Sequence, residues 1–132
     1  MGLIYLDAVF CVYALEDAGV KGETARRLIS SHQWTFSASP LVEMECLIMP
    51  LRLGRFDLEE EYRTFFANLI ALPIGREAYD RAARLRATHH TLRTPDALHL
   101  AIAQLARCEG VWTADAGFAK VGHPYVRDMF RD

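Results

Sequence analysis

Short apolar runs alternate with helical patterns along this chain, and two of these runs lead into a carboxylate. The run Leu3–Leu6 stops at Asp7, and residues 111–113 are followed closely by Asp115. Apolar runs of this length suit buried strands of a parallel sheet when helical segments separate them. The alternation therefore predicts an α/β chain with helices on both faces of the sheet.

Further strands are expected at residues 34–37, 71–74 and 124–128. Helices are expected at residues 9–16, 22–32, 40–52, 57–69, 76–90, 94–109 and 116–120. Ser39 is a suitable N-cap before Pro40, Asp57 a suitable cap for the fourth helix, and Pro50 marks a kink or stop. The basic amphipathic helix 76–90 is expected to turn four apolar residues inward: Ala78, Ala82, Ala83 and Leu85.

The size of the chain suits one domain spanning residues 1–132, because 132 residues with 52% hydrophobic content are enough for a single packed core. The net charge of −2 predicts no global preference for nucleic acid. The longest apolar runs are too short to span a bilayer and no signal peptide is visible, so we expect a cytoplasmic protein without membrane contact. Three widely spaced cysteines predict core residues and no zinc site.

Four acids stand out against apolar or helix-starting neighbours: Asp7, Glu45, Asp96 and Asp115. Asp7 and Asp115 would lie at the carboxyl ends of strands, where ligands of open α/β sheets bind. Each acid also has a structural interpretation, as a helix cap, a favourable charge in a first turn or a surface residue. If all four gather at one edge, their repulsion requires a bound cation, and ligation by carboxylates favours Mg²⁺ or Mn²⁺.

The acids lie in four ordered segments that resemble a PIN domain, and specifically the toxin ribonucleases of the VapC group. The segments are IYLDAVFCVYALE, SASPLVEMECL, LRTPDALHLAIA and VWTADAGFA. The resemblance implies a three-layer α/β/α sandwich with a short, mostly parallel sheet and an acidic site for metal-dependent RNA cleavage. By position, Asp7, Asp96 and Asp115 are the expected metal ligands. Glu45 is expected to orient or deprotonate the attacking water.

Two further residues are expected to support the acids. Thr113 matches the family's hydroxyl before the last acid and would hold a neighbouring carboxylate or a metal-bound water. His99 lies three residues after Asp96 on the same helix face, so it either bonds to the site or is a satisfied core residue.

Substrate RNA needs cations beside the acidic cleft, and basic residues precede Asp96. Arg84, Arg86 and Arg93 are the RNA-binding candidates, with Arg93 the nearest in sequence. A solvated helix face is the alternative for each.

The chain departs from the family pattern at Ala8, Val9 and Ala114, where small polar residues are usual. Such losses weaken the positioning of metal ligands. A catalytically silent PIN domain that binds RNA or protein is therefore the alternative function. A haloacid-dehalogenase phosphatase is disfavoured, since its second Asp would stand at Val9.

The resemblance implies two protein partners, a cognate antitoxin and a second copy of the chain in a homodimer. The apolar segment LVEMECLIMPLRL, residues 41–53, is too dense in large apolar side chains to be all core. We expect it to contact one of these partners, with a buried core helix as the alternative.

Overall fold

The computed structural model describes residues 2–131, which form five strands and seven helices. The strands are β1 (Leu3–Leu6), β2 (Thr35–Ala38), β3 (Ile70–Ala71), β4 (Gly110–Thr113) and β5 (Val126–Asp128). The helices are α1 (Ala8–Glu16), α2 (Val20–Ser30), α3 (Pro40–Arg52), α4 (Phe56–Ala67), α5 (Arg76–Thr88), α6 (Thr94–Leu105) and α7 (Ala116–Gly122).

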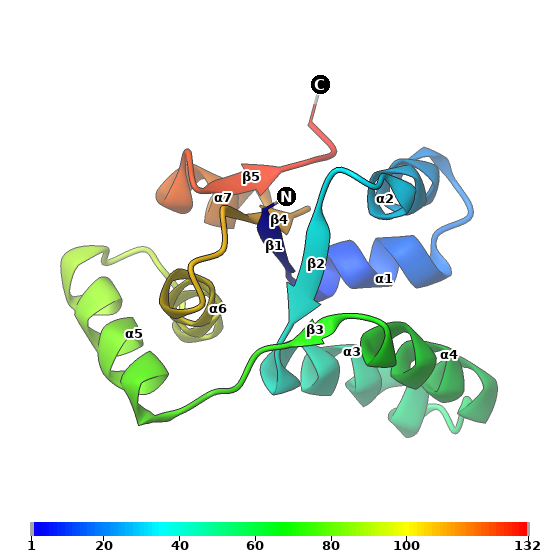
Figure 1. The fold of residues 1–132 in the computed structure, drawn as a ribbon. Coiled ribbons are helices and arrows are strands. Elements are labelled where there is room, and N and C mark those ends of the chain that lie inside the picture. The colour runs from blue at the N-terminus through cyan, green and yellow to red at the C-terminus, as the bar shows by residue number, and fades with distance from the viewer. Residues whose placement is uncertain (1, 132) are drawn as a thin grey trace.

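All strand pairs of the sheet are parallel, and the strand order is β3-β2-β1-β4-β5. The chain moves outward from β1 through β2 to β3, then crosses back to β4 and β5. Because parallel crossovers are right-handed, this reversal places the later helices on the opposite face from the earlier ones. Figure 1 shows α1 to α4 on one side of the sheet and α5, α6 and α7 on the other. The predicted three-layer, parallel α/β/α fold is confirmed.

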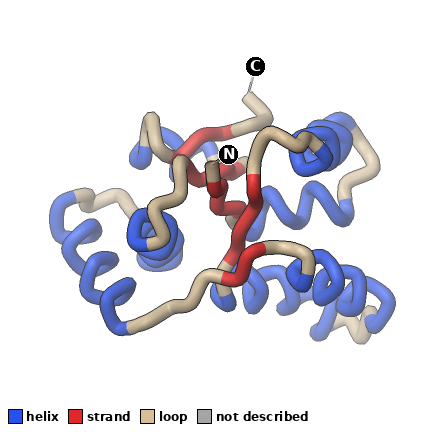
Figure 2. Tube along the Cα trace, in the orientation of Figure 1, coloured by secondary structure: helices blue, strands red, loops and turns tan. Residues whose placement is uncertain are grey.

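The strand order reverses between β1 and β4, the two central strands. Tyr5 of β1 lies opposite Ser37 of β2 and Val111 of β4. β1 leads into α1 and β4 leads into α7, and these two helices lie on opposite sides of the sheet (Figure 1). Figure 2 shows the strands together at the centre, between the helices. A crevice outside such a reversal is the usual ligand site of open α/β sheets.

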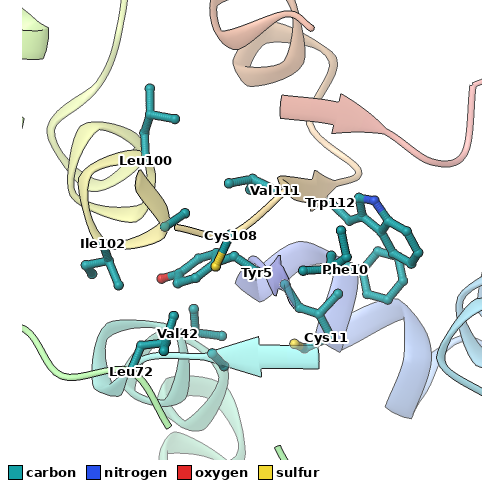
Figure 3. Packing of buried hydrophobic residues seen from close by; sticks show 14 of the residues in the cluster. Tyr5, Phe10, Cys11, Val42, Leu72, Leu100, Ile102, Cys108, Val111 and Trp112 are labelled. Atoms are coloured by element: carbon teal, nitrogen blue, oxygen red, sulfur yellow. The ribbon is translucent and has the colours of Figure 1, made fainter. Parts of the chain in front are cut away.

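The central strands are buried on both faces, which explains why their sequences are apolar without alternation. On the face covered by α1, the Phe10 and Trp112 rings pack with centroids 6.0 Å apart. Figure 3 shows these two rings together, with Cys11 below them and Tyr5 on the side of α6. The three cysteines are free and buried, as predicted.

The predicted bounds of two elements and one predicted helix cap are wrong. The helix expected at residues 94–109 ends at Leu105, with Ala106 as its C-cap. The third strand is Ile70–Ala71 and not residues 71–74, because Pro73 has no amide to donate and the ladder ends where Leu72 N donates to Ala38 O (2.8 Å). Asp57 is not the cap of α4. Arg55 holds that position, and Asp57 lies in the first turn, where it accepts from the Arg55 guanidinium (3.1 and 3.0 Å).

Within the helices, one of the two alternatives predicted for Pro50 is excluded, and one residue predicted to face inward is exposed. Pro50 lies inside α3, which continues to Arg52, so this proline does not stop the helix. On α5, Ala78 and Ala82 are buried as expected, but Ala83 is exposed because it lies one residue, about 100° of helix rotation, away from Ala82.

No helix within residues 2–131 combines the length and the apolar character needed to cross a membrane.

Candidate active site

Asp7 follows the last residue of β1 and caps α1. Its Oδ1 accepts from the backbone N–H of Phe10 (3.0 Å), and its Oδ2 accepts from the hydroxyl of Thr113. The residue is only 5% exposed. Burial raises the pKa of Asp7 to about 6, against the opposing effect of these two hydrogen bonds. Asp7 caps α1, as its structural interpretation predicts. A cap does not need to be a buried carboxylate, so this role leaves room for a function as well.

Thr113, the last residue of β4, links Asp7 to the loop that carries Asp115. Its hydroxyl donates to Asp7 and accepts from the backbone N–H of Asp115 (2.9 Å). Asp115 then caps α7, with Oδ1 accepting from the N–H groups of Gly117 (2.9 Å) and Phe118 (3.2 Å). One threonine thus fixes the acids at the ends of both central strands.

Asp96 lies in the first turn of α6 and shares a cation with Asp115. The Arg93 guanidinium donates through Nε to Asp96 Oδ2 (3.2 Å) and through Nη2 to Asp115 Oδ2 (2.9 Å). Burial raises the pKa of Asp96, Arg93 opposes the rise and the charge of Asp115 adds to it. Two acids that are 19 residues apart therefore converge on one positive group.

Glu45 on α3 contacts His99 of α6, the helix that carries Asp96. The His99 Nε2 atom lies 2.8 Å from Glu45 Oε1. His99 is 3% exposed, whereas the Glu45 side chain is 27% exposed. His99 is therefore a buried histidine that contacts Glu45, one of the four predicted acids.

A cavity of about 590 Å³ opens beside the acids. Its lining includes Arg93, Asp96, Asp115 and Lys120. Lys120, on α7, is a cation that the sequence-based reasoning missed. The available signal was its position five residues after Asp115, just over one helical turn along a short capped helix.

The other two predicted RNA-binding cations have partners away from these acids. Arg84 donates to Asp80 on the exposed face of α5 (3.0 Å). Arg86 donates to the carbonyl of Leu92 (2.8 Å) and the hydroxyl of Thr94 (2.9 Å), so it braces the connection between α5 and α6. Of the three arginines predicted to bind RNA, Arg93 is the one that contacts the acids.

The chemistry of these residues fits a hard divalent cation. Asp7, Asp96 and Asp115 offer carboxylate oxygens, and a guanidinium already bridges two of them. Within residues 2–131, however, no three Asp, Glu, His or Cys side chains are arranged to hold a metal ion. Arg93 lies between Asp96 and Asp115 and forms an ion pair with each of them.

Several solved structures share this fold. A toxin–antitoxin complex from Klebsiella pneumoniae is 22% identical over 98% of this chain and 99% of its own, with a TM-score of 0.78. The sarcin-ricin loop cleaving toxin VapC20 from Mycobacterium tuberculosis is 17% identical over 94% and 98%, with a TM-score of 0.78. FitAcB from Neisseria gonorrhoeae is 17% identical over 97% and 99%, with a TM-score of 0.72.

At these identities the likenesses show a common fold. No curated protein sequence matches the chain. The model of the PIN domain family matches residues 4–124, a range that holds all four acids, Thr113 and His99. The chain therefore belongs to the PIN domain family.

Proposed function

We propose that this protein is a metal-dependent endoribonuclease, acting in the cytoplasm as the toxin of a toxin–antitoxin pair. The observation that carries the proposal is the convergence of Asp7, Asp96 and Asp115 at the strand-order reversal, linked by Thr113 and Arg93. Family membership supports nuclease chemistry. The similar structures, a toxin–antitoxin complex and a sarcin-ricin loop cleaving toxin among them, support the biological setting.

In this proposal Asp7, Asp96 and Asp115 hold a divalent cation, with Mg²⁺ or Mn²⁺ suited to carboxylate oxygens. Bound there, such an ion supplies charge neutralisation at the scissile phosphate and lowers the pKa of the attacking water. Thr113 fixes the orientation of the Asp7 carboxylate, and burial leaves that carboxylate poorly solvated. Glu45 takes the proton from the attacking water, because its side chain is the partly exposed end of the contact with His99.

The RNA backbone requires cations beyond the acids themselves. Lys120 lines both the cavity beside the acids and a second cavity of about 710 Å³, whose lining also includes His123, Arg127, Arg131 and Asp128. Three basic side chains and one histidine against one acid give this second cavity a positive character. We propose that an RNA strand runs from the acids across α7 into it.

Replacing both Lys120 and Arg127 with Ala should weaken RNA binding and reduce its salt dependence. Each lost phosphate contact lowers the slope of log K against log salt by about 0.7 for a single strand. The measurement is RNA affinity at several salt concentrations, with Arg84→Ala as the comparison variant on α5. A larger loss in Arg84→Ala than in the double variant would instead place the RNA on α5, as the sequence predicted.

An antitoxin segment is the proposed partner of the exposed apolar face of α3. Met44, Ile48, Met49 and Leu51 are all exposed, while Leu47 faces the core. Flexible thioether and aliphatic side chains suit an exposed apolar surface that binds a helix of a partner protein. Homodimerisation stays a prediction from the family resemblance.

The assay that tests this function is incubation of purified protein with RNA and with DNA of the same sequence. We expect RNA cleavage in Mg²⁺ or Mn²⁺, none in EDTA, and none of the DNA. The alternative is a silent binding module, which the apolar residues Ala8, Val9 and Ala114 beside the acids favour. Tight RNA binding without cleavage in either metal would support that alternative and overturn the proposal.

A further inference from the structure

A hydrogen-bond network of buried polar side chains lies in the core and ends on Glu45. Tyr5 of β1 places its hydroxyl 2.8 Å from the Ser39 hydroxyl and 2.6 Å from His99 Nδ1. The other ring nitrogen of His99 lies 2.8 Å from Glu45 Oε1. Tyr5 and Ser39 are fully buried, and His99 is nearly so. Figure 3 shows the Tyr5 ring extending from β1 with its oxygen toward α6.

The donors and acceptors of this network can be assigned in only one order. An ionised Glu45 can only accept, so His99 Nε2 carries the proton that it donates. In the neutral imidazole Nδ1 is then an acceptor, and the Tyr5 hydroxyl donates to it. The Tyr5 oxygen lies 2.6 Å from Nδ1 and 2.8 Å from the Ser39 hydroxyl, so it can donate to the ring and accept from Ser39.

Ser39 completes the sequence of donors. Its hydroxyl donates to the Tyr5 oxygen, and its Oγ accepts from the backbone N–H of Val42 (3.5 Å) as the cap of α3. No buried side-chain nitrogen or oxygen within residues 2–131 lacks a hydrogen-bond partner. Every polar atom of this network is therefore hydrogen-bonded. The same cap also fixes the start of the helix that carries Glu45.

Polar groups in a core cost free energy, and an apolar pair in place of Tyr5 and His99 would hold β1 against α6 without that cost. These residues instead deliver one N–H to one oxygen of a partly exposed carboxylate. We propose that Tyr5 and His99 are positioning residues: Tyr5 holds His99 as the Nε2–H tautomer, and His99 holds the Glu45 carboxylate toward the attacking water. This inference rests on the proposed role of Glu45.

The kinetic test compares variants that keep or remove single hydrogen bonds of this network. Tyr5→Phe removes the hydroxyl and keeps the ring, and His99→Asn removes the donor to Glu45. Partners that orient catalytic groups in metal sites are worth 10- to 100-fold, so we expect kcat to fall by about that factor with KM for RNA unchanged. His99→Gln, whose amide can still donate near the Nε2 position, should recover part of the loss.

Tyr62→Phe is the matched control. Tyr62 is another fully buried tyrosine whose hydroxyl donates to a carboxylate, that of Glu16, away from the candidate site. Its removal should change stability but not kcat. Because Glu45→Gln should remove the group being positioned, adding His99→Asn to it should cause no further loss of kcat.

Two results separate the possible failures. If Glu45→Gln loses cleavage while Tyr5→Phe and His99→Asn keep the parental kcat, the network is only structural and the inference is wrong. Parental kcat in Glu45→Gln would instead overturn the role of Glu45, and the inference with it.

A direct readout does not depend on activity. Nitrogen NMR of the His99 ring should show a protonated Nε2 and a bare Nδ1, and Tyr5→Phe should reduce the share of this tautomer. A protonated Nδ1 in the parent protein would overturn the inference, whatever the cleavage assay shows.

Discussion

Asp7→Asn should abolish RNA cleavage and raise the melting temperature of the metal-free protein. The two effects have one cause, because Asp7 is a carboxylate held in a buried position that disfavours its charge. Asn keeps the shape and can still accept from the Phe10 N–H, so the cap of α1 survives. Removing the charge therefore stabilises the metal-free fold and removes a proposed metal ligand.

The expected loss of cleavage exceeds about 100-fold, the upper value for losing a group that only orients a ligand. Metal addition should raise the melting temperature of the parent and not of the variant, because a ligand of the folded state stabilises it by mass action. Asp80→Asn, on the exposed face of α5, is the control and should leave both properties unchanged. A variant that melts lower and still cleaves would make Asp7 only a helix cap.

The metal-free protein should lose stability as pH rises from about 4 to about 6. The pKa of Asp7 is about 6 in the folded protein and lies near its ordinary value of 3.8 in the unfolded chain. Between these values the folded state binds more protons, so the free energy of unfolding falls with rising pH. The full difference is about 3 kcal/mol above the folded pKa, or about 10 °C in melting temperature for a chain of this size.

Other groups titrate in the same range, so the quantity to measure is the difference between the parent and Asp7→Asn. Melts between pH 4 and pH 7.5, without metal and at constant ionic strength, give that difference. The variant should gain stability over the parent progressively above pH 4. A difference in melting temperature between the two proteins that stays constant over this pH range would show that burial does not disfavour the charge of Asp7.

The fold was predictable because the sequence pattern is locally consistent. Leu3–Leu6 and residues 110–112 carry no charged or strongly polar side chain, since both faces of a central strand are buried. Ser39 followed by Pro40 marks the start of α3 correctly. The third strand was misplaced because an edge strand of two residues leaves almost no pattern to detect.

The acids were predictable by type but their environments were not. The positions of Asp7, Asp96 and Asp115 at strand ends and helix starts follow from chain order. The bridge from Arg93 to Asp96 and Asp115 depends instead on how two loops meet in space. The Tyr5–His99 contact joins residues 94 positions apart, and neither residue marks its partner in the sequence. Lys120 was missed because its role arises from a cavity shared by separate elements.

A metal site built on these carboxylates is tested by the single-turnover rate of RNA cleavage as a function of Mg²⁺ concentration, measured for the parent, Asp7→Asn and Asp80→Asn. We expect a rate that rises and saturates with Mg²⁺ in the parent and in Asp80→Asn. We also expect loss of that rate in EDTA, recovery when Mg²⁺ is added back, and no cleavage by Asp7→Asn. A rate that persists in EDTA, or that Asp7→Asn shares with the parent, would contradict a metal site built on these carboxylates.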